Sequence, residues 1–113
     1  MINNNGIHYT STDLNKVKKL DKNIINGASV HSLDELKLAN KLGFDFVVLS
    51  QIKKTLSHPE REGMGWNKFK EIVNHSDIPV YALGGLSLSD LADAQKNGAV
   101  GISSQREGWK LLN

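Results

Sequence analysis

Short apolar runs alternate with amphipathic stretches along this chain. The runs have the length and the β-branched and aromatic content of buried strands, and they begin near Gly6, Asn23, Phe44, Pro79 and Val100. Between them, apolar residues recur every three or four positions, which predicts helices. Strands and helices that alternate in this way form a parallel sheet with right-handed crossovers. The chain is therefore expected to be an α/β protein made of five βα units.

Capping signals mark where two of the helices begin. Ser32 is followed three residues later by Glu35, and Ser87 by Asp90, which is the spacing of a capping box. The first of these helices is expected to end at Gly43, because glycine accepts the left-handed conformation that closes many helices.

Three further segments carry weaker patterns. Apolar residues at helical spacing from Leu14 to Leu20 predict a helix after the first strand. Residues 50–65 are polar and contain glycine and proline, so we expect a long irregular loop of the kind that often has a function. Ser103-Ser104 is expected to leave the fifth strand, and residues 108–112 to form a short terminal helix or a tail.

Composition narrows the class of protein. The 113 residues suffice for one domain, taken here as residues 1–113, whereas a complete eight-stranded α/β barrel needs about 250 residues. A net charge of +2 without a basic block predicts no nucleic-acid partner, and no apolar run approaches the roughly 18 residues of a membrane helix. The lack of cysteine excludes disulfides and thiolate metal sites. The polar start, without the apolar core of a signal peptide, predicts a cytoplasmic protein.

Polar groups follow each predicted strand, and parallel strands bring such groups to one edge of the sheet. These residues are Asp13, Ser29, His31, Thr55, Ser57, His58, Gly84, Gly85, Ser103 and Ser104. Hydroxyls and backbone N–H groups suit the oxygens of a small phosphorylated ligand, and an imidazole transfers protons near neutral pH. Gly84-Gly85 stands between a strand and a helix start, where unpartnered N–H groups attract anions, and is therefore a candidate phosphate cradle.

Each of these residues also has a structural interpretation that the sequence leaves open. Gly84-Gly85 fits a tight turn that needs positive φ or close packing, and Asp13 fits a first-turn acid favoured by the helix dipole. Ser29 fits a turn hydroxyl, and His31 fits a hydrogen-bonded structural histidine. His8 has a weaker case for a functional role because it falls inside a strand pattern.

Several segments resemble thiamine-phosphate synthase and its relative TenI. They are residues 27–35, 43–46, 79–86 and 97–102, and their order and spacing match over nearly the whole chain. Another set of segments looks like the synthase-like domain that is fused behind a Nudix (MutT-type) hydrolase in some bacteria. That set comprises residues 49–55, 57–59, 65–66 and 80–86, with Arg106 and Trp109.

The resemblance implies a fold and a phosphate site. The family fold is a (βα)8 barrel that binds phosphate after its last two strands, here at Gly84-Gly85 and Ser103-Ser104. Ser29 matches a serine that meets the substrate pyrophosphate, and Asp13 matches one magnesium-ligand aspartate. His31 matches the histidine that TenI uses for proton transfer.

The chain also departs from the family pattern. Thr55 and Ser57 occupy the positions of a Thr-x-Thr loop, but His58 stands where the synthase has lysine. The five βα units correspond to the family's last five, so the expected fold is a partial TIM-barrel-like domain. The three strands without a counterpart carry most of the pyrophosphate and magnesium groups, and one aspartate is a poor magnesium site. The sequence therefore leaves open whether magnesium is a cofactor.

Two functions are consistent with these residues. One is a domain of thiamine metabolism that binds a phosphorylated thiazole, as a synthase-like transferase or a TenI-like tautomerase with His31 and Ser29 as catalytic candidates. The other is a non-catalytic binding or assembly module, a remnant half-barrel that accompanies a Nudix-type hydrolase. The open edges and apolar inner faces of an unclosed sheet predict a homo-oligomer or a partner chain that completes the barrel.

Overall fold

A six-stranded sheet organises the computed structural model, which describes residues 6–53, 62–104 and 108–111. Its strands follow one another in chain order: β1 (Gly6–Tyr9), β2 (Ile25–Val30), β3 (Phe46–Leu49), β4 (Val80–Leu83), β5 (Gly101–Ser104) and β6 (Gly108–Leu111). The first five strands pair in parallel, and β6 pairs antiparallel with β5. The five parallel strands confirm the predicted α/β architecture and its partial-barrel form.

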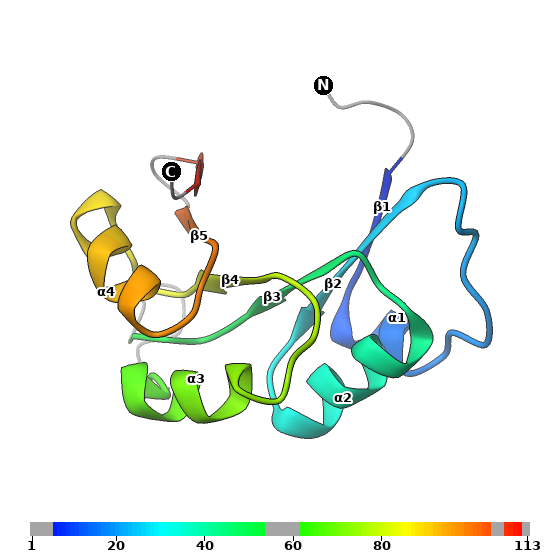
Figure 1. Cartoon of the computed structure of the whole chain (residues 1–113), viewed down its shortest axis with the longest axis horizontal. Helices are drawn as coiled ribbons and strands as arrows, with labels where there is room; N and C mark the ends of the chain where they lie inside the picture. Colours follow the sequence, from blue (N-terminus) through cyan, green and yellow to red (C-terminus); the bar gives the residue numbers. More distant parts are fainter. Residues whose placement is uncertain (1–5, 54–61, 105–107, 112–113) are drawn as a thin grey trace.

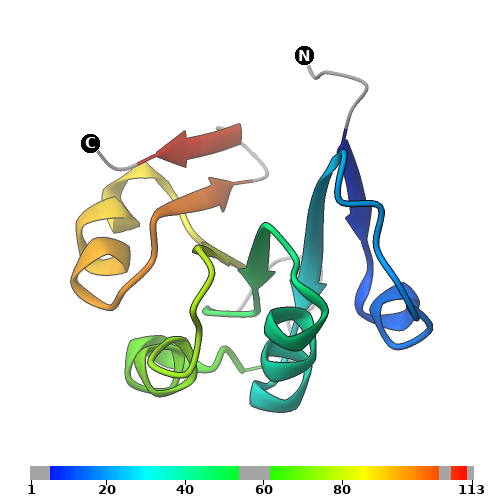
Figure 2. The same cartoon turned by 45° about the vertical axis from the view of Figure 1, so that its right-hand side comes forward.

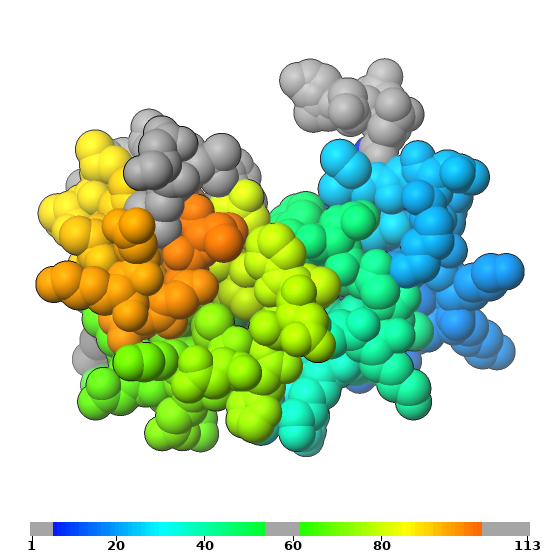
Figure 3. Space-filling view, in the orientation of Figure 1, coloured from blue at the N-terminus to red at the C-terminus, as the bar shows by residue number. Residues whose placement is uncertain are grey.

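The helices lie along the convex side of the curved sheet, and its concave side faces away from them (Figures 1 and 2). They are α1 (Ser11–Leu14), α2 (Leu33–Leu42), α3 (Gly65–Val73), the 3-10 turn η1 (Leu88–Asp90) and α4 (Leu91–Lys96). Figure 3 shows α2, α3 and the segment that joins α3 to β4 closing over one side of the sheet. In the described part of the chain, no helix has the length and apolar character needed to span a bilayer.

Capping groups define the helix boundaries much as the sequence predicts. The Ser32 hydroxyl accepts a hydrogen bond of 3.2 Å from the Glu35 N–H at the start of α2. Gly43 ends that helix with φ of 88°. At η1, Ser87 and Asp90 form the expected capping box, with the Ser87 N–H donating to Asp90 Oδ2 at 2.9 Å.

Two expectations about the segments after strands are wrong. Residues 108–111 form β6 rather than a helix or tail, and Ser103-Ser104 lies within β5 rather than beyond it. The pairing of Ser103 with Trp109 explains both differences, because it gives the backbone groups at the edge of β5 a partner strand.

The first helix is shorter than predicted. It ends at Leu14, where the Asn15 side chain donates a hydrogen bond of 2.8 Å to the Ser11 carbonyl. Leu14 and Leu20 are nevertheless both buried. Both leucines are therefore core contacts, but Leu14 lies in the helix and Leu20 in the irregular segment that follows it.

The core fills the space between the sheet and the helices. Alternate strand residues face this layer, and all are at most 2% exposed: Ala28, Val30, Val47, Leu49, Val80, Ala82 and Ile102. Leu36 and Ala39 of α2 and Phe69 of α3 meet them from the helix side. This packing fixes the strands and hence the positions of the segments that follow them.

Candidate functional site

Strand register brings the ends of four parallel strands to one edge of the sheet. Val30 pairs with Leu49, Leu49 pairs with Ala82, and Leu83 pairs with Ser103. The segments that follow β2, β3 and β4 therefore emerge beside the end of β5. We refer to this edge, with the side chains and amides that it presents, as the carboxyl rim.

Gly84-Gly85 follows β4 at the carboxyl rim, with φ values of 116° and 69°. A Cβ on Gly84 would lie 2.9 Å from Gln51 Cα and from the Ile52 nitrogen. The Gly84 carbonyl accepts a hydrogen bond of 2.9 Å from the Lys53 N–H. Glycine is therefore required at Gly84 by close packing and positive φ, and at Gly85 by positive φ. This agrees with the interpretation of the pair as a tight turn.

Ser103 and Ser104 belong to β5, with β4 on one side and β6 on the other. Because Leu83 lies opposite Ser103, Gly84 is level with Ser104 on the neighbouring strand. The structure therefore brings the glycine pair and the serine pair together, although they are about twenty positions apart in the sequence.

An ion pair that the sequence did not reveal lies next to the glycine pair. Lys53 Nζ is 2.6 Å from Asp90 Oδ1, and the Asp90 side chain is 11% exposed. Burial alone would raise the pKa of Asp90, but hydrogen bonds from Lys53 and from the Ser87 N–H hold it below its usual value. The pair joins the segment after β3 to the helix start that follows Gly84-Gly85.

His31 directly follows β2 and is exposed. Its Nδ1 lies 3.3 Å from the hydroxyl oxygen of Ser50, which is buried after β3. Its backbone N–H donates to Glu35 Oε1 at 2.7 Å and so adds to the cap of α2. The His31 imidazole therefore lies at the carboxyl rim with Nδ1 close to Ser50. The backbone N–H of the same residue helps to cap α2.

Ser29 has a histidine partner that sequence reasoning missed. Its hydroxyl oxygen lies 2.8 Å from Nε2 of His8 on β1. The two side chains share the concave face because His8 pairs with Gly27, two residues before Ser29. Desolvation lowers the pKa of His8 below its usual value. Strand alternation combined with the β1–β2 register was the signal that could have found this pair.

Asp13 and the three residues of the predicted substrate loop remain. Asp13 is exposed on α1, and its backbone N–H donates to Thr10 Oγ1 at 3.1 Å. Within residues 6–53, 62–104 and 108–111, no three His, Asp or Glu side chains gather as a metal site would require. Thr55, Ser57 and His58 lie outside the described residues.

The fold and the rim define a class of protein, and comparisons with known proteins place the chain within it. A curved parallel sheet whose strands follow one another in chain order, with the helices along its convex side, defines a TIM-barrel-like α/β domain. The family model described as "Thiamine monophosphate synthase" matches residues 1–107. The chain belongs to this thiamine-phosphate synthase and TenI family, as the sequence resemblance predicts.

Individual relatives agree with this assignment. A protein of Aquifex aeolicus named "Putative thiamine-phosphate synthase 2" is 47% identical over 87 residues, which are 77% of this chain and 47% of that protein. The thiamine-phosphate synthase of Methanococcus maripaludis is 31% identical over 90% of this chain and 50% of its own length. The chain thus spans about half the length of the curated relatives that it matches.

Solved structures show the same fold. Thiamine phosphate pyrophosphorylase from Pyrococcus furiosus superposes with a TM-score of 0.68 at 26% identity, over 88% of this chain and 48% of that one. A mandelate oxidase mutant superposes with a TM-score of 0.64 at 15% identity, a likeness of fold alone.

Proposed function

We propose that this chain is a ligand-binding domain of thiamine metabolism that takes a phosphorylated thiazole at its carboxyl rim. The phosphate would meet the backbone N–H groups of the Gly84-Gly85 turn, beside Ser103-Ser104 at the end of β5. The observation that carries the proposal is the β4–β5 register, which places the two pairs side by side. Family membership supports it, since the named relatives are thiamine-phosphate synthases.

The chemistry of the rim suits this ligand. A phosphate ester carries negative charge and only accepts hydrogen bonds, so it needs N–H and O–H donors. Backbone amides at a turn with successive positive φ values supply such donors without a charged side chain. Lys53 lies next to this turn, but its ammonium group is paired with Asp90, so the amides would be the main donors to the ligand phosphate.

His31 and Ser29 are the catalytic candidates if the domain is an enzyme. A synthase-like transferase would use Ser29 at a pyrophosphate, and a TenI-like tautomerase would use His31 to move a proton. Unchanged turnover of a thiazole carboxylate phosphate by His31→Ala would remove His31 from the mechanism. Magnesium would have Asp13 as its single assigned ligand.

A pair of substitutions at Gly85 tests the phosphate site. Asp and Asn both tolerate left-handed φ, so Gly85→Asp and Gly85→Asn impose similar strain while differing by one negative charge. Calorimetric titration with thiazole phosphate should show binding to the wild type and to Gly85→Asn. Gly85→Asp should weaken that binding at least tenfold more than Gly85→Asn does. Equal affinities of the two variants would place the phosphate elsewhere.

A second function rests on the open face of the sheet. We define the open face as the concave side that presents His8, Ile25, Ser29, Phe46 and Tyr81. Ile25 there is 52% exposed, and the chain spans half the length of its relatives. A non-catalytic assembly module, including one that accompanies a Nudix-type hydrolase, would cover this face with a second copy or a partner chain.

Solution mass distinguishes the arrangements of this open face. Light scattering of the chain alone should give a dimer or larger species if copies cover each other, and Ile25→Lys should then return it to a monomer. A stable monomer in both cases would assign the face to a different chain or leave it to solvent. We place either function in the cytoplasm, as the sequence predicts.

A further inference from the structure

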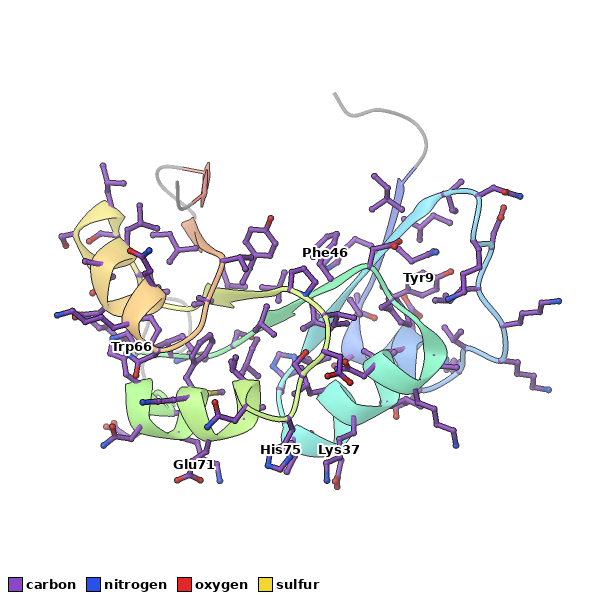
Figure 4. The ribbon with its side chains drawn as sticks, in the orientation of Figure 1. Tyr9, Lys37, Phe46, Trp66, Glu71 and His75 are labelled. Atoms are coloured by element: carbon purple, nitrogen blue, oxygen red, sulfur yellow. The ribbon has the colours of Figure 1, made fainter. Side chains whose placement is uncertain are left out.

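The hydrogen bond between His8 and Ser29 is the basis of a further assignment, which rests on the proposed function. His8 Nε2 and Ser29 Oγ are 2.8 Å apart, a normal hydrogen-bond length. The His8 ring is also near the Phe46 ring, with centroids 6.2 Å apart. Figure 4 shows Phe46 on the side of the sheet that faces away from α2 and α3. The pair therefore belongs to the open face.

We propose that His8 is a positioning residue that donates its Nε2–H to Ser29 and thereby turns the Ser29 hydroxyl proton toward an anionic oxygen of the ligand. A hydroxyl has one proton to give and two lone pairs that accept. An anionic phosphate oxygen can only accept, so Ser29 must donate to it. The His8–Ser29 bond must then run in the opposite sense, with nitrogen as donor and serine oxygen as acceptor.

This chain of two hydrogen bonds has a physical advantage. The imidazole fixes a hydroxyl that would otherwise rotate among its staggered positions, so less entropy is lost when the anion binds. A donor on one side of a hydroxyl also polarises it and strengthens the bond on the other side. His8 thus acts through Ser29 and needs no contact with the ligand.

The surroundings of His8 keep its ring neutral at physiological pH. Strands β1, β2 and β3 contain no Asp, Glu, Lys or Arg. The elements packed most closely on β1 in the described structure are β2 and α1, and Asp13 of α1 is the ionisable side chain among their residues. On β1 itself, Tyr9 is the other ionisable residue. Tyr81 of β4 lies beyond Phe46, with its ring centroid 5.7 Å from that of Phe46. With the pKa of His8 lowered by desolvation, one ring nitrogen carries a proton and the other does not.

The tautomer of His8 is the first test, and it needs no ligand. Nitrogen-15 NMR of the imidazole distinguishes a proton on Nε2 from a proton on Nδ1. The assignment requires the Nε2–H form in the wild-type chain near pH 7.5. The Nδ1–H form would make Ser29 the donor to His8 and would overturn the proposal. The exposed His75 is an internal reference in the same spectra.

Binding of inorganic pyrophosphate is the second test. Ser29→Ala should weaken it about ten- to a hundredfold, as expected for a lost hydrogen bond to a charged group. His8→Phe keeps a flat apolar ring without a donor and should weaken it about two- to tenfold. His8→Gln restores an N–H donor and should stay within about twofold of wild type. His75→Gln is the matched control and should change nothing.

The outcomes separate this assignment from the proposed function. If Gly85→Asp abolishes pyrophosphate binding while Ser29→Ala and His8→Phe leave it unchanged, the rim binds the anion but the role of His8 is wrong. If His8→Gln is as weak as His8→Phe, shape rather than hydrogen bonding matters and the proposal also fails. If the wild type binds neither pyrophosphate nor thiazole phosphate, both the proposed function and this assignment fall.

Discussion

The two faces of one sheet differ sharply in this protein. The helix-covered face carries Val47, Leu49 and Ala82, all with 0% exposure. The open face carries a histidine, a serine and the aromatic rings of Phe46 and Tyr81, and Ile25 on it is 52% exposed. Because the same strands supply both faces, the difference lies in alternate residues. The helix-covered face forms the core, and the open face keeps polar and aromatic side chains outside that core.

The largest expected effect is on the helix-covered face. Leu49→Ala should lower the free energy of unfolding by about 2–5 kcal/mol, since it removes buried methyl groups and leaves a cavity. Ile25→Ala on the open face is the matched control and should cost less than about 1 kcal/mol at protein concentrations where the chain is monomeric. Urea denaturation measures both. Equal losses would mean that the open face is also packed.

An intermediate effect is expected where the open face is crowded. A Cβ on Gly27 would lie 2.2 Å from the Phe46 ring, so Gly27→Ala must displace that ring. The expected loss is about 1–3 kcal/mol. Gly27→Ala in a Phe46→Leu background should cost less, because the obstructing ring is gone. A double-mutant cycle without coupling between the two positions would contradict this packing.

Asp90→Asn tests the link between the carboxyl rim and the helix-covered layer. It weakens both the capping box and the pair with Lys53, so a loss of about 1 kcal/mol is expected at pH 7. Because the pKa of Asp90 is lowered in the folded state, its contribution is present above the usual value of 3.8 and is lost as the pH falls through the folded value. The difference between wild type and variant should therefore shrink in acid. A difference independent of pH would show that the carboxylate charge does not matter.

The smallest predicted effect is a pH dependence from the open face. The pKa of His8 is lowered in the folded state, so protonation favours the unfolded chain. Stability from this group is fully present above the ordinary value of 6.5 and falls as the pH drops below it. His8→Gln should flatten the stability profile between about pH 5 and 7. An unchanged profile in urea denaturation would show that His8 titrates normally.

Local sequence patterns predicted the residues of the helix-covered face. They did not predict which residues pair on the open face. Neighbouring residues specify the Ser32 cap of α2, the capping box at Ser87 and the strand alternation of the core, and the structure contains all three. The pairing of His8 with Ser29 depends on the register between two strands twenty residues apart, which no local pattern specifies. The strand at residues 108–111 was missed because it forms only by pairing with β5.

The most direct test of the account is the response of four amides to one ligand. In a heteronuclear NMR titration of the wild-type chain with thiazole phosphate, the N–H signals of Gly84, Gly85, Ser103 and Ser104 should shift together and saturate with a single dissociation constant. Amides on the helix-covered layer, such as those of α3, should stay in place. Saturable shifts that avoid these four residues, or no shifts at all, would contradict a phosphate site at the carboxyl rim.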